Sequence, residues 1–173
     1  MNILRTSLPI VGIGLLVYIL GMFILQQAGQ LYSNAPTWLF RFVVLAGATV
    51  AIVRLRLLQG NLISFTQGVS IGMLTSVALG VFISLHTYVQ RTHLSPEYNT
   101  HLRDIVRANL ERETDPKWTE EQIRKQLDER WGFYFTTTGG MTIDLISSTA
   151  LGFMAALSVG YMARRVKVQG GKA

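Results

Sequence analysis

Four long apolar segments dominate the pattern of hydrophobic and polar positions along the chain. They run over Leu8–Leu25, Thr37–Leu57, Phe65–Gln90 and Met141–Ala163. A helix needs about 20 mostly apolar residues to cross the ~30 Å hydrocarbon core of a bilayer. The pattern therefore predicts an all-α integral membrane protein with four transmembrane helices. A cleaved signal peptide is the alternative interpretation of the first segment, but no small-x-small cleavage site follows it.

A single polar stretch, Arg91–Trp131, separates the third and fourth apolar segments, and it holds basic and acidic side chains in nearly equal number. After Ser95 and Pro96, apolar residues recur at helical spacing as far as Glu113. Thr119 and Gln122 then have the spacing of a capping box, ahead of a second and shorter apolar stripe. The pattern predicts an amphipathic helical hairpin between helices three and four.

Three parts of the chain follow from these segments. Residues 1–90 are expected to form transmembrane helices one to three, residues 91–135 the amphipathic hairpin, and residues 136–173 the fourth helix with a basic tail. A flexible re-entry is expected at residues 136–142, because Gly139 and Gly140 lie there.

The placement of basic residues predicts the orientation of the chain. Arg5 precedes the first apolar segment, Arg54 and Arg56 end the second and lead into the turn before the third, and four more lysines and arginines end the chain, whereas the first loop has none. Because cytoplasmic loops are enriched in lysine and arginine, both termini are expected on the cytoplasmic side of a bacterial inner membrane. The hairpin is then external.

Small residues recur at every fourth position of the third and fourth apolar segments. In lipid, helices associate by close packing rather than by burial from water, and small residues let two backbones approach. We therefore expect a packing interface between these helices that is formed by Gly68, Gly72, Ser76, Gly80 and Ser84 on one side and by Ser148, Gly152, Ala156 and Gly160 on the other.

Three ionisable residues fall at a similar depth of the predicted bundle: Arg41, His86 and Asp144. Ionisable side chains inside membrane segments usually face the bundle and pair with one another, so a membrane-embedded cluster with an Arg41–Asp144 pair is one hypothesis. The other is that each side chain extends separately to its own interface, since His86 and Asp144 lie close to predicted helix ends.

Composition removes several classes of function. The chain has no cysteine, which excludes a disulfide framework, thiolate metal sites and a thiol nucleophile. The net charge of +6 lies mainly beside the membrane segments, where it sets topology, so no nucleic-acid partner is expected. Glu97, His101 and Asp104 could hold a metal ion weakly, but a solvated polar helix face is the favoured interpretation. We expect no catalytic residue, no metal site and no cofactor.

Short phrases of the sequence resemble a known family. They are the entry to helix three, Asn61-Leu62-Ile63-Ser64-Phe65, then Ser95-Pro96-Glu97-Tyr98, and the segment Trp118–Ile123 before the last helix. Together with the order of the helices, they resemble the domain-of-unknown-function family 4199, small four-helix membrane proteins common in Bacteroidetes. The resemblance covers nearly the whole chain and implies no activity, cofactor or catalytic residue.

The function expected from the sequence is that of a non-enzymatic, multi-pass inner-membrane protein, an accessory or self-associating subunit. Its partners would be membrane lipids and either a membrane protein or further copies of itself. The expected contact surface lies on the hairpin and is formed by Leu102, Ile105, Leu127 and Trp131. The alternative is a small oligomeric transporter or channel, with Arg41, His86 and Asp144 near its path.

Overall fold

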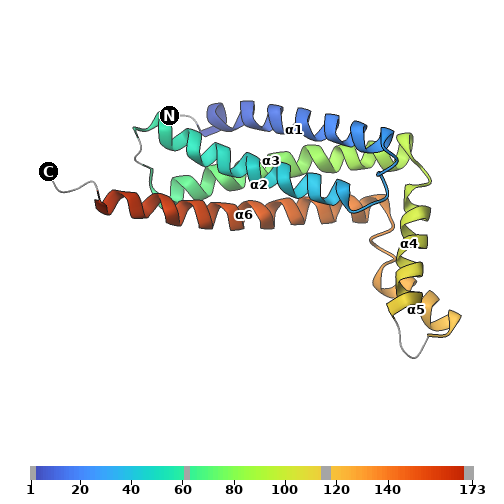
Figure 1. The fold of residues 1–173 in the computed structure, drawn as a ribbon. Helices are drawn as coiled ribbons and strands as arrows, with labels where there is room; N and C mark the ends of the chain where they lie inside the picture. The colour runs from blue at the N-terminus through green and yellow to red at the C-terminus, as the bar shows by residue number, and fades with distance from the viewer. Residues whose placement is uncertain (1–2, 61–62, 114–117, 170–173) are drawn as a thin grey trace. The chain divides into compact units, whose positions relative to one another are not determined.

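A computed structural model describes residues 3–60, 63–113 and 118–169, with side chains for all of these except Glu113 and the residues beyond Val159. Every regular element in these ranges is helical, which confirms the predicted all-α class. In chain order the elements are α1 (Ile3–Gln27), α2 (Ala35–Leu58), α3 (Phe65–Val89), the π-helical segment η1 (Gln90–Leu94), α4 (Tyr98–Glu113), α5 (Glu120–Arg130) and α6 (Thr137–Gln169) (Figure 1).

Four helical segments within the described residues are long and apolar enough to cross a bilayer. They are Ile3–Gln27, Ala35–Leu58, Phe65–Leu94 and Thr137–Val159. The shortest has 23 residues, which at 1.5 Å per residue extends about 35 Å, more than the hydrocarbon core requires. The prediction of four candidate membrane spans is confirmed in number and order.

The predicted start of the last helix is wrong. Gly139 and Gly140, expected in a flexible re-entry, lie in the first turn of α6. Thr136 Oγ1 accepts the N–H of Gly139 at 2.9 Å, which satisfies a donor at the helix start. A Cβ at Gly139 would overlap the Phe133 carbonyl oxygen, so this glycine permits a close approach rather than a flexible turn.

The chain forms two compact units. The bundle unit consists of Met1–Ile83 with Leu145–Ala173, and the α4–α5 unit consists of Ser84–Asp144. Figure 1 shows α1, α2, α3 and α6 side by side in the bundle unit. Its core includes Ile10 of α1, Ala51, Ile52 and Leu55 of α2, Ile71 of α3 and Ala156 of α6.

Close approaches between α3 and α6 occur where one of the two helices carries a glycine. A Cβ at Gly72 would lie 3.0 Å from the Cβ of Ala156. One at Gly80 would overlap Ser148, and one at Gly152 would overlap Ser76. These contacts join residues of the two predicted small-residue lines. Gly68 instead lies next to Ile63 and Ile52, Ser84 belongs to the α4–α5 unit, and the surroundings of Gly160 lie outside the described residues.

In the α4–α5 unit, a capping box begins α5, and two ion pairs join α5 to α4. Thr119 and Gln122 form the predicted capping box, in which each side chain bonds the other residue's backbone N–H. Arg103 of α4 pairs with Asp128 of α5 at 2.7 Å, and Arg107 pairs with Glu120. These ion pairs are exposed, so water screens them and each contributes little to stability on its own. Buried Ile123 of α5 adds apolar packing.

We predict that Gly80→Ala lowers the free energy of unfolding by roughly 1–3 kcal/mol, because the new methyl group would overlap Ser148. Gly12→Ala is the matched control, since a Cβ at Gly12 meets no atom within 4 Å. Both changes raise helix propensity equally, so the difference reports packing alone. Thermal unfolding of the two variants in one detergent, followed by circular dichroism, measures it. Equal midpoints for the two variants would contradict the packing account.

Candidate functional site

Arg91 is the centre of the most densely bonded polar site in the described residues. It lies on η1, directly after α3, and its side chain is buried, with 8% relative exposure. The Nη1 atom donates to Asn99 Oδ1 at 3.1 Å and to the carbonyl oxygens of Tyr134 and Thr136 at 3.2 Å each. One guanidinium therefore joins η1, α4 and the segment that leads into α6.

The wider π-helical turn helps to place this arginine. Gln90 accepts the backbone N–H of Ser95 on its carbonyl oxygen at 2.8 Å, and its Nε2 donates to Ser95 Oγ at 3.0 Å. These two bonds close the turn around Arg91. Single π-helical turns often occur at functional sites. The third apolar segment was predicted to run to Gln90; the α-helix ends at Val89, and the π-helical turn extends helical structure to Leu94.

Two further contacts fix the plane of the guanidinium. Its Cζ atom lies 5.0 Å from the ring centre of Tyr98, which is within cation–π range. On another side is Gly140, where a Cβ would lie 2.5 Å from Arg91 Cζ. Burial raises the pKa of Tyr98 above its usual value, and the nearby charge of Arg91 opposes that shift in part. The phenol therefore stays neutral, with the arginine against its face.

The start of α6 is tied to the end of α3 by two hydroxyl groups. Thr87 Oγ1 donates to Asp144 Oδ2 at 2.6 Å, a short bond typical of a charged acceptor. Ser84 Oγ donates to the Met141 carbonyl at 3.0 Å. Asp144 also interacts electrostatically with Arg91. Within the part of the chain that the structure describes, no carboxylate forms an ion pair with Arg91, so its charge is balanced mainly by carbonyl dipoles.

The three residues of the predicted membrane-embedded cluster are divided between the two units. Arg41 belongs to the bundle unit, where it is exposed and its guanidinium lies 5.1 Å from the ring centre of Trp38. His86 and Asp144 belong to the α4–α5 unit, and both are partly buried. The Arg41–Asp144 pair therefore remains a prediction.

Sequence reasoning missed Arg91 and Thr87. Arg91 was interpreted only as the first residue of the polar stretch, and Thr87 as part of an apolar helix. A usable signal was present, because the two lie four positions apart and so share a helix face. The tertiary partners Tyr134 and Thr136 accept through backbone carbonyls, which carry no side-chain signature in a sequence.

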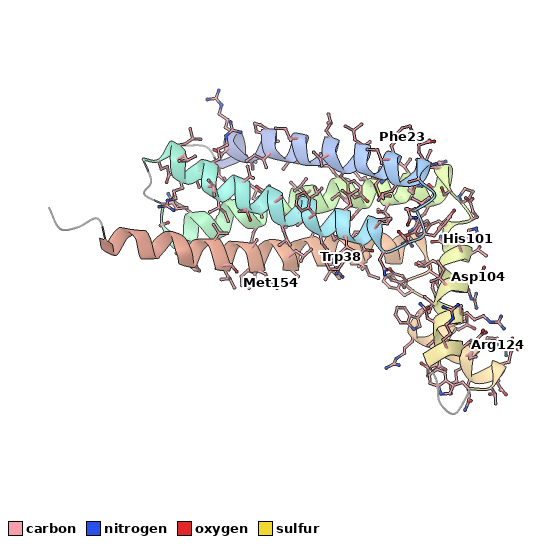
Figure 2. The ribbon with its side chains drawn as sticks, in the orientation of Figure 1. Phe23, Trp38, His101, Asp104, Arg124 and Met154 are labelled. Atoms are coloured by element: carbon pink, nitrogen blue, oxygen red, sulfur yellow. The ribbon has the colours of Figure 1, made fainter. Side chains whose placement is uncertain are left out.

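The predicted contact surface on the hairpin is only partly accessible. Leu127 is buried, and Leu102 is half-buried. Ile105 and Trp131 are each 38% exposed. Trp131 also packs edge-to-face with Tyr134, with ring centres 5.9 Å apart. Figure 2 marks His101 and Asp104 on α4 and Arg124 on α5, all of them exposed polar residues.

Two hollows of the bundle unit, each lined by described residues, are almost wholly apolar. One of about 170 Å³ lies between α1 and α2 and is lined by residues that include Ile13, Val17, Phe42 and Val50. The other, of about 530 Å³, is lined by Met73 of α3 and residues of α6 that include Leu145 and Phe153. Large apolar side chains also project outward from the helices, as Phe23 and Met154 show in Figure 2.

Among the described residues, no three histidine, aspartate or glutamate side chains lie close enough together to hold a metal ion. The polar site around Arg91 contains a guanidinium, amide and carbonyl oxygens, a phenol and a carboxylate. These groups can hold neighbouring helices in position, and they stabilise the buried charge of Arg91.

Comparison with known proteins gives one finding. A family model described as protein of unknown function (DUF4199) matches residues 9–165, most of the chain. The family resemblance predicted from the sequence is therefore confirmed. Searches of curated proteins and of solved structures found no match.

We predict that Arg91→Lys destabilises the fold by roughly 1–3 kcal/mol, because the lysine side chain is shorter and has no planar group, so it loses hydrogen bonds to the three acceptors and the stacking over Tyr98. Arg124→Lys, at an exposed position of α5, is the control and should change the midpoint little. Thermal unfolding in detergent compares the two. If the two substitutions have the same effect, Arg91 does not hold the site together.

A second prediction concerns alkaline pH. Because the pKa of Tyr98 is raised in the folded chain, its contribution to stability is present below its ordinary pKa near 10. That contribution is lost as the pH rises from there through the folded pKa. The stability of the wild type relative to Tyr98→Phe should therefore fall above pH 10. Unfolding midpoints of both proteins between pH 8 and 11.5 measure this, and a difference that does not change with pH would disprove the assignment.

Proposed function

The chain belongs to the DUF4199 family, and we propose that it acts as a non-enzymatic, multi-pass membrane protein, an accessory or self-associating subunit that works through protein and lipid contacts. The observation that supports this most directly is the apolar lining of both hollows of the bundle unit. An apolar hollow at membrane depth accepts a lipid chain or a side chain from a neighbouring helix. It offers no hydration to a polar solute.

We place the protein in the bacterial inner membrane with both termini cytoplasmic and the α4–α5 unit outside. The support is the distribution of basic residues, which leaves the loop at Ala28–Asn34 without charge. Arg5 in the first turn of α1 and Arg54 and Arg56 near the end of α2 favour the cytoplasmic side for these helix ends. The same orientation puts the ion pairs of α4 and α5 in water, where exposed charges are stable.

The protein partner, or second copy, is proposed to contact Ile105 and Trp131. Both are large, apolar and partly exposed, Ile105 on α4 and Trp131 at the end of α5, where the neighbouring exposed residues are mostly charged or polar. Exposed aromatic and aliphatic residues among polar ones are the usual anchors of protein interfaces. The small-residue contacts of α3 with α6 have a different role, because they hold the bundle itself together.

A small oligomeric transporter or channel is the second candidate. It is favoured by Asp144, a carboxylate within a candidate membrane span that accepts a hydrogen bond from Thr87. Carboxylates within membrane spans often mark paths for ions or protons. A path for a polar solute would require further polar lining, supplied by neighbouring copies.

We expect extraction of the tagged protein with its native lipids, followed by intact mass determination, to give a mass above 19.3 kDa plus bound lipid. A second polypeptide supports the accessory role, and multiples of the chain mass support self-association. Ile105→Glu should reduce either assembly, whereas Asp104→Asn on the neighbouring exposed position should not. A monomer under all conditions would contradict the proposal.

The rival function has its own test. The purified protein in liposomes should show no electrogenic flux at any pH if the accessory role is correct. A flux that Asp144→Asn abolishes would establish the transporter or channel instead.

A further inference from the structure

The charges of the chain are separated between the two units. All ten acidic residues lie between Glu97 and Asp144, within the α4–α5 unit. The bundle unit contains no acidic residue, yet it holds eight of the sixteen lysines and arginines. Its basic residues are Arg5, Arg41, Arg54, Arg56, Arg164, Arg165, Lys167 and Lys172. They therefore have no carboxylate partner within their own unit.

Most of these residues belong to one end of the bundle unit. The core cluster there joins Ile10 of α1, Leu55 of α2 and Ala156 of α6, with Ile3 and Val159 packed against it. The start of α1, the end of α2 and the later part of α6 consequently meet at the same end. Arg5 lies two positions after Ile3, Arg54 and Arg56 flank Leu55, and α6 continues past Val159 toward its basic residues.

Arg56 is an incompletely satisfied donor at this end. Its Nε atom is buried and has no hydrogen-bond partner among the described residues. Arg54 is exposed on the same turn. Beyond both, Leu57 and Leu58 are 65% and 56% exposed, so apolar side chains continue past the two guanidinium groups. Two arginines followed by two exposed leucines are suited to the boundary between the acyl chains and the headgroups of a bilayer.

We propose that this basic end binds the phosphate of anionic phospholipids, with Arg54 and Arg56 as its principal ligands and Arg5 in support. Orientation alone requires only an excess of positive charge; it does not require a half-buried arginine directly before two exposed leucines. A phosphate offers several acceptor oxygens to a guanidinium fork, and basic sites between membrane helices on the cytoplasmic side bind anionic headgroups. The apolar neighbours Leu57 and Leu58 suit the acyl chains of the same lipid.

The inference rests on the lipid contacts of the proposed function and specifies the lipid class. It is tested by native mass spectrometry of the full-length protein titrated with phosphatidylglycerol or phosphatidylcholine in the same detergent. Wild-type protein should retain phosphatidylglycerol preferentially. Replacing both residues, Arg54→Gln with Arg56→Gln, should weaken phosphatidylglycerol binding by roughly tenfold to thirtyfold, since each basic residue near a membrane surface contributes a few-fold. Binding of phosphatidylcholine should stay unchanged.

The matched control removes the same charge from the α4–α5 unit, by Arg124→Gln with Arg130→Gln, both exposed. This variant should keep the wild-type preference. If the double variant of α2 does not fold, Arg54→Gln alone serves, because its side chain is exposed, and a loss of about fivefold is expected.

Equal retention of the two lipids by the wild type, or the same loss in the control as in the α2 variant, would overturn the inference. Competition by millimolar glycerol phosphate to the same extent as by the lipid would also overturn it, since the site would then bind a soluble phosphate. A second polypeptide or a second copy in the spectra, without lipid preference, would leave the proposed function intact and reject the lipid site.

Discussion

The bundle unit depends on the close approach of α3 to α6. At Gly72, Gly80 and Gly152 the two helices are so near that a methyl group at any of the three would crowd or overlap the neighbouring helix. In lipid this approach supplies the packing energy that burial from water supplies in soluble proteins. The hydroxyl-bearing residues Ser76 and Ser148 are buried completely at the same seam. Their small volume leaves room for Gly80 and Gly152 of the facing helix to come close.

The α4–α5 unit depends on a different interaction, the buried guanidinium of Arg91. A charged group with so little access to water needs several acceptors, and it finds them on Asn99 and on two backbone carbonyls. Because those carbonyls lie just before α6, the arginine ties the end of η1 to the segment that leads into that helix. Gly140 has no side chain for the same reason, since any Cβ there would collide with Arg91. The polar part of the chain is thereby organised by one residue at the end of an apolar helix.

Much of the architecture could be predicted from the sequence, because membrane helices have a strong signal in length and hydropathy. The four spans, the capping box at Thr119 and the family resemblance were all predicted correctly. The glycines at 139 and 140 were misinterpreted, because a pair of glycines suggests a flexible turn unless the neighbouring backbone is known. Arg91 was missed for a similar reason, since its acceptors at Tyr134 and Thr136 are carbonyl oxygens some forty residues away.

The close packing of α3 against α6 through small residues is tested most directly by cross-linking. The chain has no cysteine, so an introduced pair is the only one present. Gly72→Cys with Ala156→Cys puts two Cβ atoms 3.0 Å apart, somewhat closer than the ~3.8 Å of a disulfide, so a small outward shift of either helix allows the bond. Oxidation in native membranes should give an intramolecular bond, and Gly12→Cys with Ala156→Cys should give none. Failure of the first pair to bond, or equal bonding of both, would contradict the account.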